Sequence, residues 1–226
     1  ATASTASPSR WSLTPPSPVT AWPPSVGVRA SYPAEVTSAA PPASFAAALE
    51  SLRRVRYRPE LSVEEAPAPQ RLAPHAVALT AEFVEDDEEM ASGRLVLLHD
   101  PDGVDAWEGD FRVVTFIKAV LEPDLAADPL LTGVAWTWLQ EALDAHPAER
   151  AALGGTVTRV TSESFGTIGD RAVSGPVEIR ASWTHRGSPD EVGAEAEAWV
   201  ALLAQAAGLL PLPQGVAVLS PSSRGR

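Results

Sequence analysis

The stretch VEIRASWT, residues 177–184, decides the fold of this chain. Its apolar residues occupy every second position: Val177, Ile179, Ala181 and Trp183. A period of two is typical of a β-strand with one buried and one wet face. Such clean alternation normally arises in an antiparallel sheet, because parallel strands are buried on both faces. The segment therefore predicts an antiparallel sheet.

Other segments read as further strands of the same sheet. They are Val77–Val84, Arg94–His99, Phe111–Leu121 and Thr156–Glu163. The acidic run Glu85–Glu89 is too polar to pack and predicts a solvated hairpin connection between the first two. Gly154 and Gly155 are predicted to open the last of these strands, whose broken alternation indicates a bulge.

Three helices accompany the strands. Ser44 is predicted to cap the first, Asp128 with Pro129 to begin the second, and Ser188 with Pro189 to begin the third. The resulting order is α-β-β-β-α-β-β-α. It predicts an α+β fold in which helices flank an antiparallel sheet of about five strands.

The 22 prolines divide the chain into parts. Residues 1–43 are rich in Pro, Ser and Ala and poor in charge, which predicts a disordered tail. Residues 44–213 form a single predicted α+β domain, in which the proline-containing stretch 59–74 is an irregular crossing segment. Residues 214–226 are predicted to be a flexible C-terminal tail.

Composition excludes several classes of function. The 226 residues include no Cys and carry a net charge of -12, which argues against cysteine chemistry and a large nucleic-acid footprint. Neither a secretory signal pattern nor a run of ~18 apolar residues is found, so we expect a soluble, acidic, cytoplasmic protein without membrane contact. P-loop, GxGxxG, HExxH and GxSxG motifs are missing, so we expect no cofactor, metal or catalytic residues. These absences favour a non-enzyme without deciding the matter.

A basic cluster is the sharpest local anomaly. Residues 43–213 hold 13 basic and 28 acidic residues, a net of -15, yet five arginines gather around Tyr57. They are Arg53, Arg54, Arg56, Arg58 and Arg71. One interpretation is contact with RNA or an acidic protein, with Tyr57 available for stacking. The other, which we favour, is internal pairing with Glu60, Glu64, Glu65 or Glu85–Glu89.

Two further segments are candidate sites. Ser162, Glu163, Ser164, Phe165 and Gly166 are predicted to form a loop at a strand end, either to bind a ligand or simply to end the strand through side-chain hydrogen bonds. The carboxylates Asp105, Glu108 and Asp110 surround Trp107 and suggest a hydrolase, for which two of them would have to face each other across a cleft. A solvated acidic loop is the favoured alternative.

Long segments carry a resemblance to a known family. FAAALESLRRVRYRPELSVEEAPAPQRLAPHAVALTAEF at residues 45–83 looks like the opening of an uncharacterised actinobacterial family, catalogued as domain of unknown function three thousand. ASGRLVLLHDPDGVDAWEGDFRVVTFIKA, VTRVTSESFG and EIRASW also resemble it. The resemblance covers about residues 44–213 and implies no activity.

The element order is also similar to that of type III secretion chaperones, small α+β proteins that bind other polypeptides. This likeness is one of topology alone. We therefore expect a non-catalytic binding or interaction module with a protein partner or self-association. The alternatives are an accessory factor that contacts RNA through Arg53–Arg58, and a hydrolase that uses the acids near Trp107.

Overall fold

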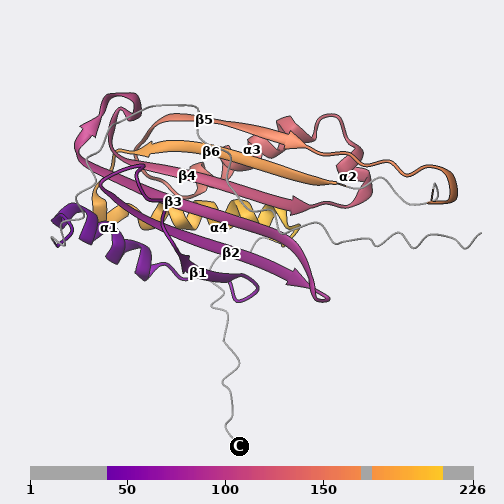
Figure 1. The fold of residues 1–226 in the computed structure, drawn as a ribbon, viewed down its shortest axis with the longest axis horizontal. Coiled ribbons are helices and arrows are strands. Elements are labelled where there is room, and N and C mark those ends of the chain that lie inside the picture. The colour runs from indigo at the N-terminus through magenta and orange to yellow at the C-terminus, as the bar shows by residue number, and fades with distance from the viewer. Residues whose placement is uncertain (1–39, 169–174, 211–226) are drawn as a thin grey trace, which may run out of the picture. The chain divides into compact units, whose positions relative to one another are not determined.

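The alternating segments pair into one antiparallel sheet, as the sequence predicts (Figure 1). The computed structural model describes residues 40–168 and 175–210. The strands are β1 (Ser62–Ala66), β2 (His75–Glu85), β3 (Glu88–Val104), β4 (Gly109–Val120), β5 (Arg150–Arg159) and β6 (Pro176–His185). Across the sheet their order is β1-β2-β3-β4-β6-β5, so β1 and β5 are its edges.

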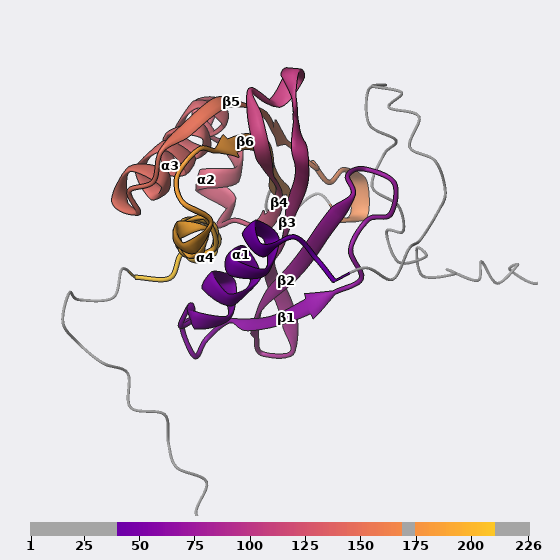
Figure 2. The same ribbon diagram turned by 90° about the vertical axis from the view of Figure 1, so that its left-hand side faces the viewer.

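Helices cover one face of the sheet (Figure 2). They are α1 (Ala43–Arg54), α2 (Pro123–Ala127), α3 (Leu131–Ala145) and α4 (Gly193–Ala206). Single 3-10 turns occur at Asp105–Trp107, Gly166–Ile168 and Pro189–Glu191. Ser188 and Glu191 form a capping box at the last of these, so the predicted helix start is confirmed within a few residues.

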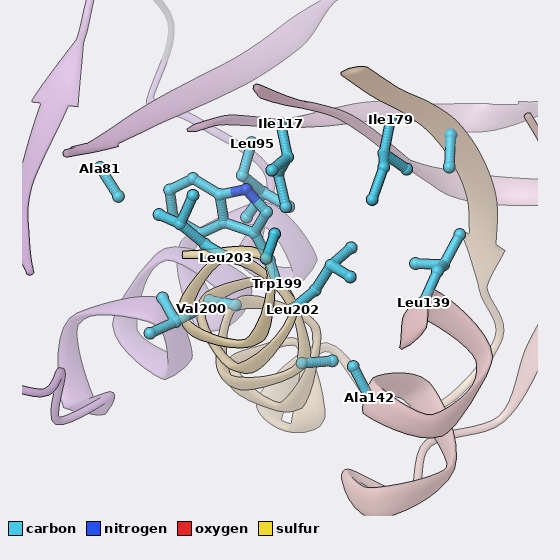
Figure 3. Close-up of a cluster of buried hydrophobic side chains, with 14 of the residues drawn as sticks. Ala81, Leu95, Ile117, Leu139, Ala142, Ile179, Trp199, Val200, Leu202 and Leu203 are labelled. Carbon is cyan, nitrogen blue, oxygen red and sulfur yellow. The ribbon is translucent and has the colours of Figure 1, made fainter. Parts of the chain in front are cut away.

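The core lies between the sheet and α4, and Trp199 is at its centre (Figure 3). The indole is 1% exposed and points from α4 toward Leu95 and Ile117 on the sheet. A Cβ at Gly93 would lie 3.2 Å from this indole, so the glycine on β3 leaves room for the ring. Burying a large apolar side chain in this way stabilises the fold by about 1.5–3 kcal/mol.

The opposite face of the sheet carries a smaller apolar cluster. Ala78, Val96 and Leu98 are buried there, and half-buried Ala68 and Ala73, from the segment between β1 and β2, pack against them. The proline-containing segment 59–74 thus covers part of this face.

Four details differ from the sequence prediction. Ser44 lies inside α1, whose N-cap is Pro42, and its hydroxyl contacts His99 instead of capping the helix. The short helix α2 was not predicted, and α3 begins at Leu131 and not at Pro129.

The sheet has six strands, because the predicted irregular segment contains the short edge strand β1. β5 spans Arg150–Arg159 and not Thr156–Glu163, so the glycine pair lies inside the strand. Gly155 is needed there because a Cβ would lie 2.3 Å from the Arg180 carbonyl oxygen of β6. The observed irregularity lies between Ala151 and Gly154, before the segment Thr156–Glu163 in which the sequence predicts a bulge.

The predicted tails fall almost entirely outside the described residues. Residues 40–43 are the described part of the predicted N-terminal tail, and α1 already begins at Ala43. Residues 214–226 are not described. In the described part of the chain, the helices lack the combination of length and apolar character that a membrane crossing demands.

Candidate functional site

The connection between α1 and β1 positions the basic cluster. α1 ends at Arg54, where the backbone becomes extended at Val55 (φ -63°, ψ 133°). Extended backbone sends successive side chains in opposite directions. Tyr57 is half-buried against the core, whereas Arg56 is exposed. The chain therefore presents arginines around an anchored phenol ring.

Tyr57 lines a cavity of about 780 Å³. We call it the Tyr57 cavity. The α1–β1 connection, α3, α4 and the residues after α4 form it. Its apolar lining residues are Val55, Ala142, Ala145, Val200, Ala201, Ala204 and Leu209. Its polar lining residues are Arg56, Tyr57, Arg58, Glu141, His146, Glu197 and Gln205.

The predicted cluster is only partly brought together at this cavity. Arg56, Tyr57 and Arg58 line it, and Arg53 with Tyr57 lines a neighbouring hollow of about 300 Å³. Arg54 lines neither of them. Arg71 is exposed on the segment between β1 and β2, with φ 72°.

Internal pairing holds two of the arginines. Arg58 Nη2 lies 3.1 Å from Glu60 Oε1, and Arg58 Nη1 donates to the Leu210 carbonyl oxygen at 3.0 Å. The hydrogen bond from Arg58 lowers the pKa of Glu60. Arg53 lies 3.5 Å from Glu50, a partner that the sequence analysis did not name. No ion pair or side-chain hydrogen bond is found for Arg54 or Arg56 among residues 40–168 and 175–210.

Tyr57 keeps its proton in this setting. Burial raises the pKa of its phenol, and the carboxylate of Glu197 raises it further. The hydroxyl makes no hydrogen bond to another residue of the described chain. A protonated phenol is a hydrogen-bond donor, so Tyr57 adds an uncharged donor to the guanidinium of Arg56, which is also unpaired in the described chain.

Two carboxylates also line the Tyr57 cavity. Glu141 on α3 and Glu197 on α4 are both exposed and line it. Gln205 reaches Glu141 Oε2 at 3.5 Å, and His146 Nδ1 lies 2.9 Å from the Ala142 carbonyl oxygen. Sequence reasoning missed these residues, because charges on the polar face of a helix look like ordinary solvent contacts.

The other two candidate segments lie elsewhere. Residues 162–166 follow β5, and Phe165 among them is 77% exposed. Near Trp107, Asp105 and Glu108 are exposed, while Asp110 Oδ2 lies 3.9 Å from His99 Nε2. Neither segment lines the Tyr57 cavity or the hollow beside it. The binding loop and the hydrolase therefore remain predictions without a described cleft.

A buried polar cluster joins α4 to the sheet, and we call it the Glu195 network. Glu195 Oε2 accepts hydrogen bonds from Arg150 Nε at 2.7 Å and Trp183 Nε1 at 2.8 Å. Glu195 Oε1 lies 2.7 Å from His185 Nδ1, and His185 Nε2 lies 3.0 Å from the Ser188 carbonyl oxygen. Both ring nitrogens thus face acceptors, which requires the imidazolium form.

The pKa of His185 follows from this geometry. Burial alone would lower it, but the hydrogen bonds to Glu195 and Ser188 and the charge of Glu195 together raise it, against the repulsion of Arg150. Glu195, Trp183 and His185 are each 1% exposed or less, so a substrate would have no access to them. The Glu195 network is therefore structural. Within residues 40–168 and 175–210, no group of three or more His, Asp or Glu side chains is arranged to hold a metal ion.

Comparison with known families finds one match. The model of the family described as "Protein of unknown function (DUF3000)" matches residues 41–217, which include α1 to α4 and all six strands. No curated protein matches the chain, and no solved structure matches it. The family match agrees with the resemblance seen in the sequence and extends to both sides of it. The chain therefore belongs to the DUF3000 family of proteins of unknown function.

Proposed function

We propose that this chain is a non-catalytic binding module, and that the Tyr57 cavity holds a segment of a partner polypeptide. The observation that carries the proposal is the composition of this cavity. Small apolar side chains, the arginines Arg56 and Arg58 and the carboxylates Glu141 and Glu197 line one and the same cavity. Its volume of about 780 Å³ falls in the range of ligand sites, about 300–1,000 Å³.

The mixed charges favour a polypeptide over a nucleic acid. Arg56 and Arg58 line the same cavity as Glu141 and Glu197. A phosphate backbone would meet both carboxylates, whereas a peptide carries side chains of either sign and an apolar group for the apolar lining residues. The phenol of Tyr57 supplies a donor for a backbone carbonyl of that peptide.

The lining also argues against catalysis in this cavity. Its residues include no Ser, Thr, Cys or Lys, so covalent catalysis by an aliphatic hydroxyl, a thiol or an amine finds no nucleophile in the described lining. His146 is engaged with a backbone carbonyl through Nδ1. What the cavity supplies is shape, charge and hydrogen-bond donors, and these are the properties of a recognition site.

A selection with random peptides tests the proposal. The full chain is used to select binders from a displayed peptide library, and the affinity of the selected peptides is measured by fluorescence anisotropy. Arg56→Glu should weaken binding by about tenfold or more, since it reverses a charge that lines the cavity. Tyr57→Phe should weaken it by a few-fold, because it removes the donor alone.

Arg54→Glu is the matched control. It makes the same charge change two residues earlier, at an exposed arginine that does not line the cavity, and should leave peptide affinity unchanged. Selected peptides that bind Arg56→Glu as tightly as the native chain overturn the proposal. A labelled single-stranded oligouridine is tested in the same way. If it binds the native chain, and if Arg54→Glu and Arg56→Glu abolish this binding equally, the arginine cluster is instead assigned to RNA.

A further inference from the structure

The two edges of the sheet differ in how they are protected. An edge strand presents unpaired backbone N–H and C=O groups, and proteins blunt such edges with short strands, charges or prolines. β1 has only five residues, Ser62–Ala66, of which two are glutamates, and Pro67 follows it at once. β1 thus carries all three of these protections.

β5 is long and lacks charges and prolines in its interior. Its ten residues read RAALGGTVTR, so eight residues without a charge or a proline lie between Arg150 and Arg159. An irregularity between Ala151 and Gly154 interrupts its first half, where Arg112 donates to the Ala152 carbonyl oxygen, so the regular part of this edge is residues 154–159. Residues 153–156 are exposed. β6 pairs with one side of β5, and no strand of residues 40–168 and 175–210 pairs with the other (Figure 1).

The terminal arginines of β5 are used inside the molecule. Arg150 donates to Glu195 and to the carbonyl oxygens of Leu143 and His146. Arg159 donates to the carbonyl oxygen of Ala127 at 2.8 Å. Both guanidinium groups are thus bound to other residues of the same chain, so their charges do not oppose the addition of another strand at this edge.

A groove runs beside the first half of β5. This hollow of about 420 Å³ lies between α3 and β5, and Leu143, Ala151, Ala152 and Leu153 are among its lining residues. Leu153 is 39% exposed. Gln140, Asp144 and Arg150 also line this hollow, so it is of mixed polarity. The edge therefore combines unpaired backbone with a neighbouring hollow, which is the combination that strand addition uses.

We propose that β5 pairs antiparallel with β5 of a second copy of this chain, so that two six-stranded sheets join into one. An antiparallel pair of identical strands is related by a two-fold axis, so a single edge is complementary to itself. The eight central residues carry no charge, so like charges do not meet across the axis. This self-complementarity favours a second copy over a foreign strand.

Two adjacent glycines provide a way to test the pairing. The midpoint of β5 falls between Gly154 and Gly155, so a centred pairing places both near the axis. A Cβ at Gly155 would lie 2.3 Å from the Arg180 carbonyl oxygen, whereas a Cβ at Gly154 meets nothing within 4 Å. Gly154 therefore accepts a side chain without disturbing the contact with β6.

The experiment compares Gly154→Glu with the native chain by sedimentation equilibrium over a wide range of protein concentration. The native chain should form dimers. Gly154→Glu brings two carboxylates together near the axis and should raise the dimer dissociation constant by about tenfold or more. Gly133→Glu is the matched control, because Gly133 is exposed on α3, also has nothing within 4 Å of its Cβ, and receives the same charge. It should dimerise like the native chain.

Hydrogen exchange gives a second readout. The amides of residues 153–158 should gain protection as the concentration of the native chain rises, and Gly154→Glu should lose this gain while its circular dichroism stays native. A native chain that remains monomeric at every concentration overturns the proposal, as does a dimer that Gly154→Glu leaves intact. Protection of β5 only on addition of a synthetic extended peptide would also overturn it, and would assign the edge to a foreign strand.

Discussion

His99 and His185 lie on one line across the sheet, yet their surroundings shift their pKa values in opposite directions. His99 on β3 pairs with Phe111 on β4, which pairs with His185 on β6. Both histidines are 1% exposed or less. Around His185 every ring nitrogen has an acceptor, and its pKa is raised.

His99 lies in an aromatic stack instead. The ring centroid of Phe111 lies 4.2 Å from that of His99, and the ring centroids of Phe45 and His75 lie within 6 Å of it. Nε2 lies 3.2 Å from Ser44 Oγ, whereas Nδ1 is buried without a partner in the described chain. Burial lowers the pKa of His99, against the attraction of Asp110. The surroundings of His185 thus favour an imidazolium cation, whereas those of His99 favour a neutral ring.

The largest expected effect comes from removing the carboxylate that pairs with His185. Glu195→Gln leaves the Arg150 guanidinium and the His185 imidazolium without their buried carboxylate, and should lower the free energy of unfolding by about 3–5 kcal/mol. Urea denaturation followed by circular dichroism measures it. Glu197→Gln, two residues later on the exposed side of α4, should change it by less than about 0.5 kcal/mol. Equal losses in the two variants would show that Glu195 is not a special anchor.

Removing the imidazolium should give the next largest effect. His185→Gln should cost about 2–3 kcal/mol below pH 6.5, because hydrogen bonds of a charged group are lost. The native contribution is fully present below the unfolded pKa of 6.5 and disappears as the pH rises through the raised pKa of folded His185. The difference in unfolding free energy between native chain and variant should therefore shrink above pH 6.5. A difference that stays constant with pH contradicts this assignment.

Two buried tryptophans extend the comparison. Trp183 donates to Glu195, whereas Trp199 Nε1 has no acceptor in the described chain. Replacement by Phe removes a similar ring area from each, but only Trp183→Phe breaks a hydrogen bond to a carboxylate. Trp183→Phe should therefore be the more destabilising by about 1–2 kcal/mol in urea denaturation. The reverse order would mean that packing of the Trp199 indole outweighs that hydrogen bond.

The smallest effect is expected on the aromatic side. His99→Phe keeps an aromatic ring in the stack and should change the free energy of unfolding at pH 7 by less than about 1.5 kcal/mol. The pH profile distinguishes it from His185→Gln. The contribution of neutral His99 is present above pH 6.5 and is lost as the pH falls through its lowered folded pKa, so the variant should resist acid better than the native chain. Equal acid sensitivity would contradict a neutral His99.

How much of the fold could be predicted depends on where each strand lies. β6 is predicted within two residues, since its position inside the sheet buries every second side chain. β1 could not be recognised, because a short edge strand buries little on either face, and its residues read as a polar loop. The start of β5 could not be predicted, because Gly155 is required by its close contact with the backbone of β6, which is distant in the sequence.

The candidate site shows the same limit. Arginines around Tyr57 stand out in so acidic a chain, and two of them, Arg56 and Arg58, line the cavity. Glu141 and Glu197 line it too, but only because α3 and α4 pack beside the connection. Glu195 resembles an ordinary acid in the first turn of a helix, and nothing local reveals that it is buried.

The contact between the first and last helices has a consequence for synthesis. Ser51 on α1 donates to the Asp190 carbonyl oxygen and accepts from the amide of Gly193, across 139 residues or more of sequence. At a usual elongation rate, about 7–28 s separate the emergence of the two partners from the ribosome. Throughout that interval the apolar stripe of Phe45, Ala48 and Leu52 lacks its final cover. The nascent chain is thus most exposed to aggregation at its beginning, and completing the last helix ends that exposure.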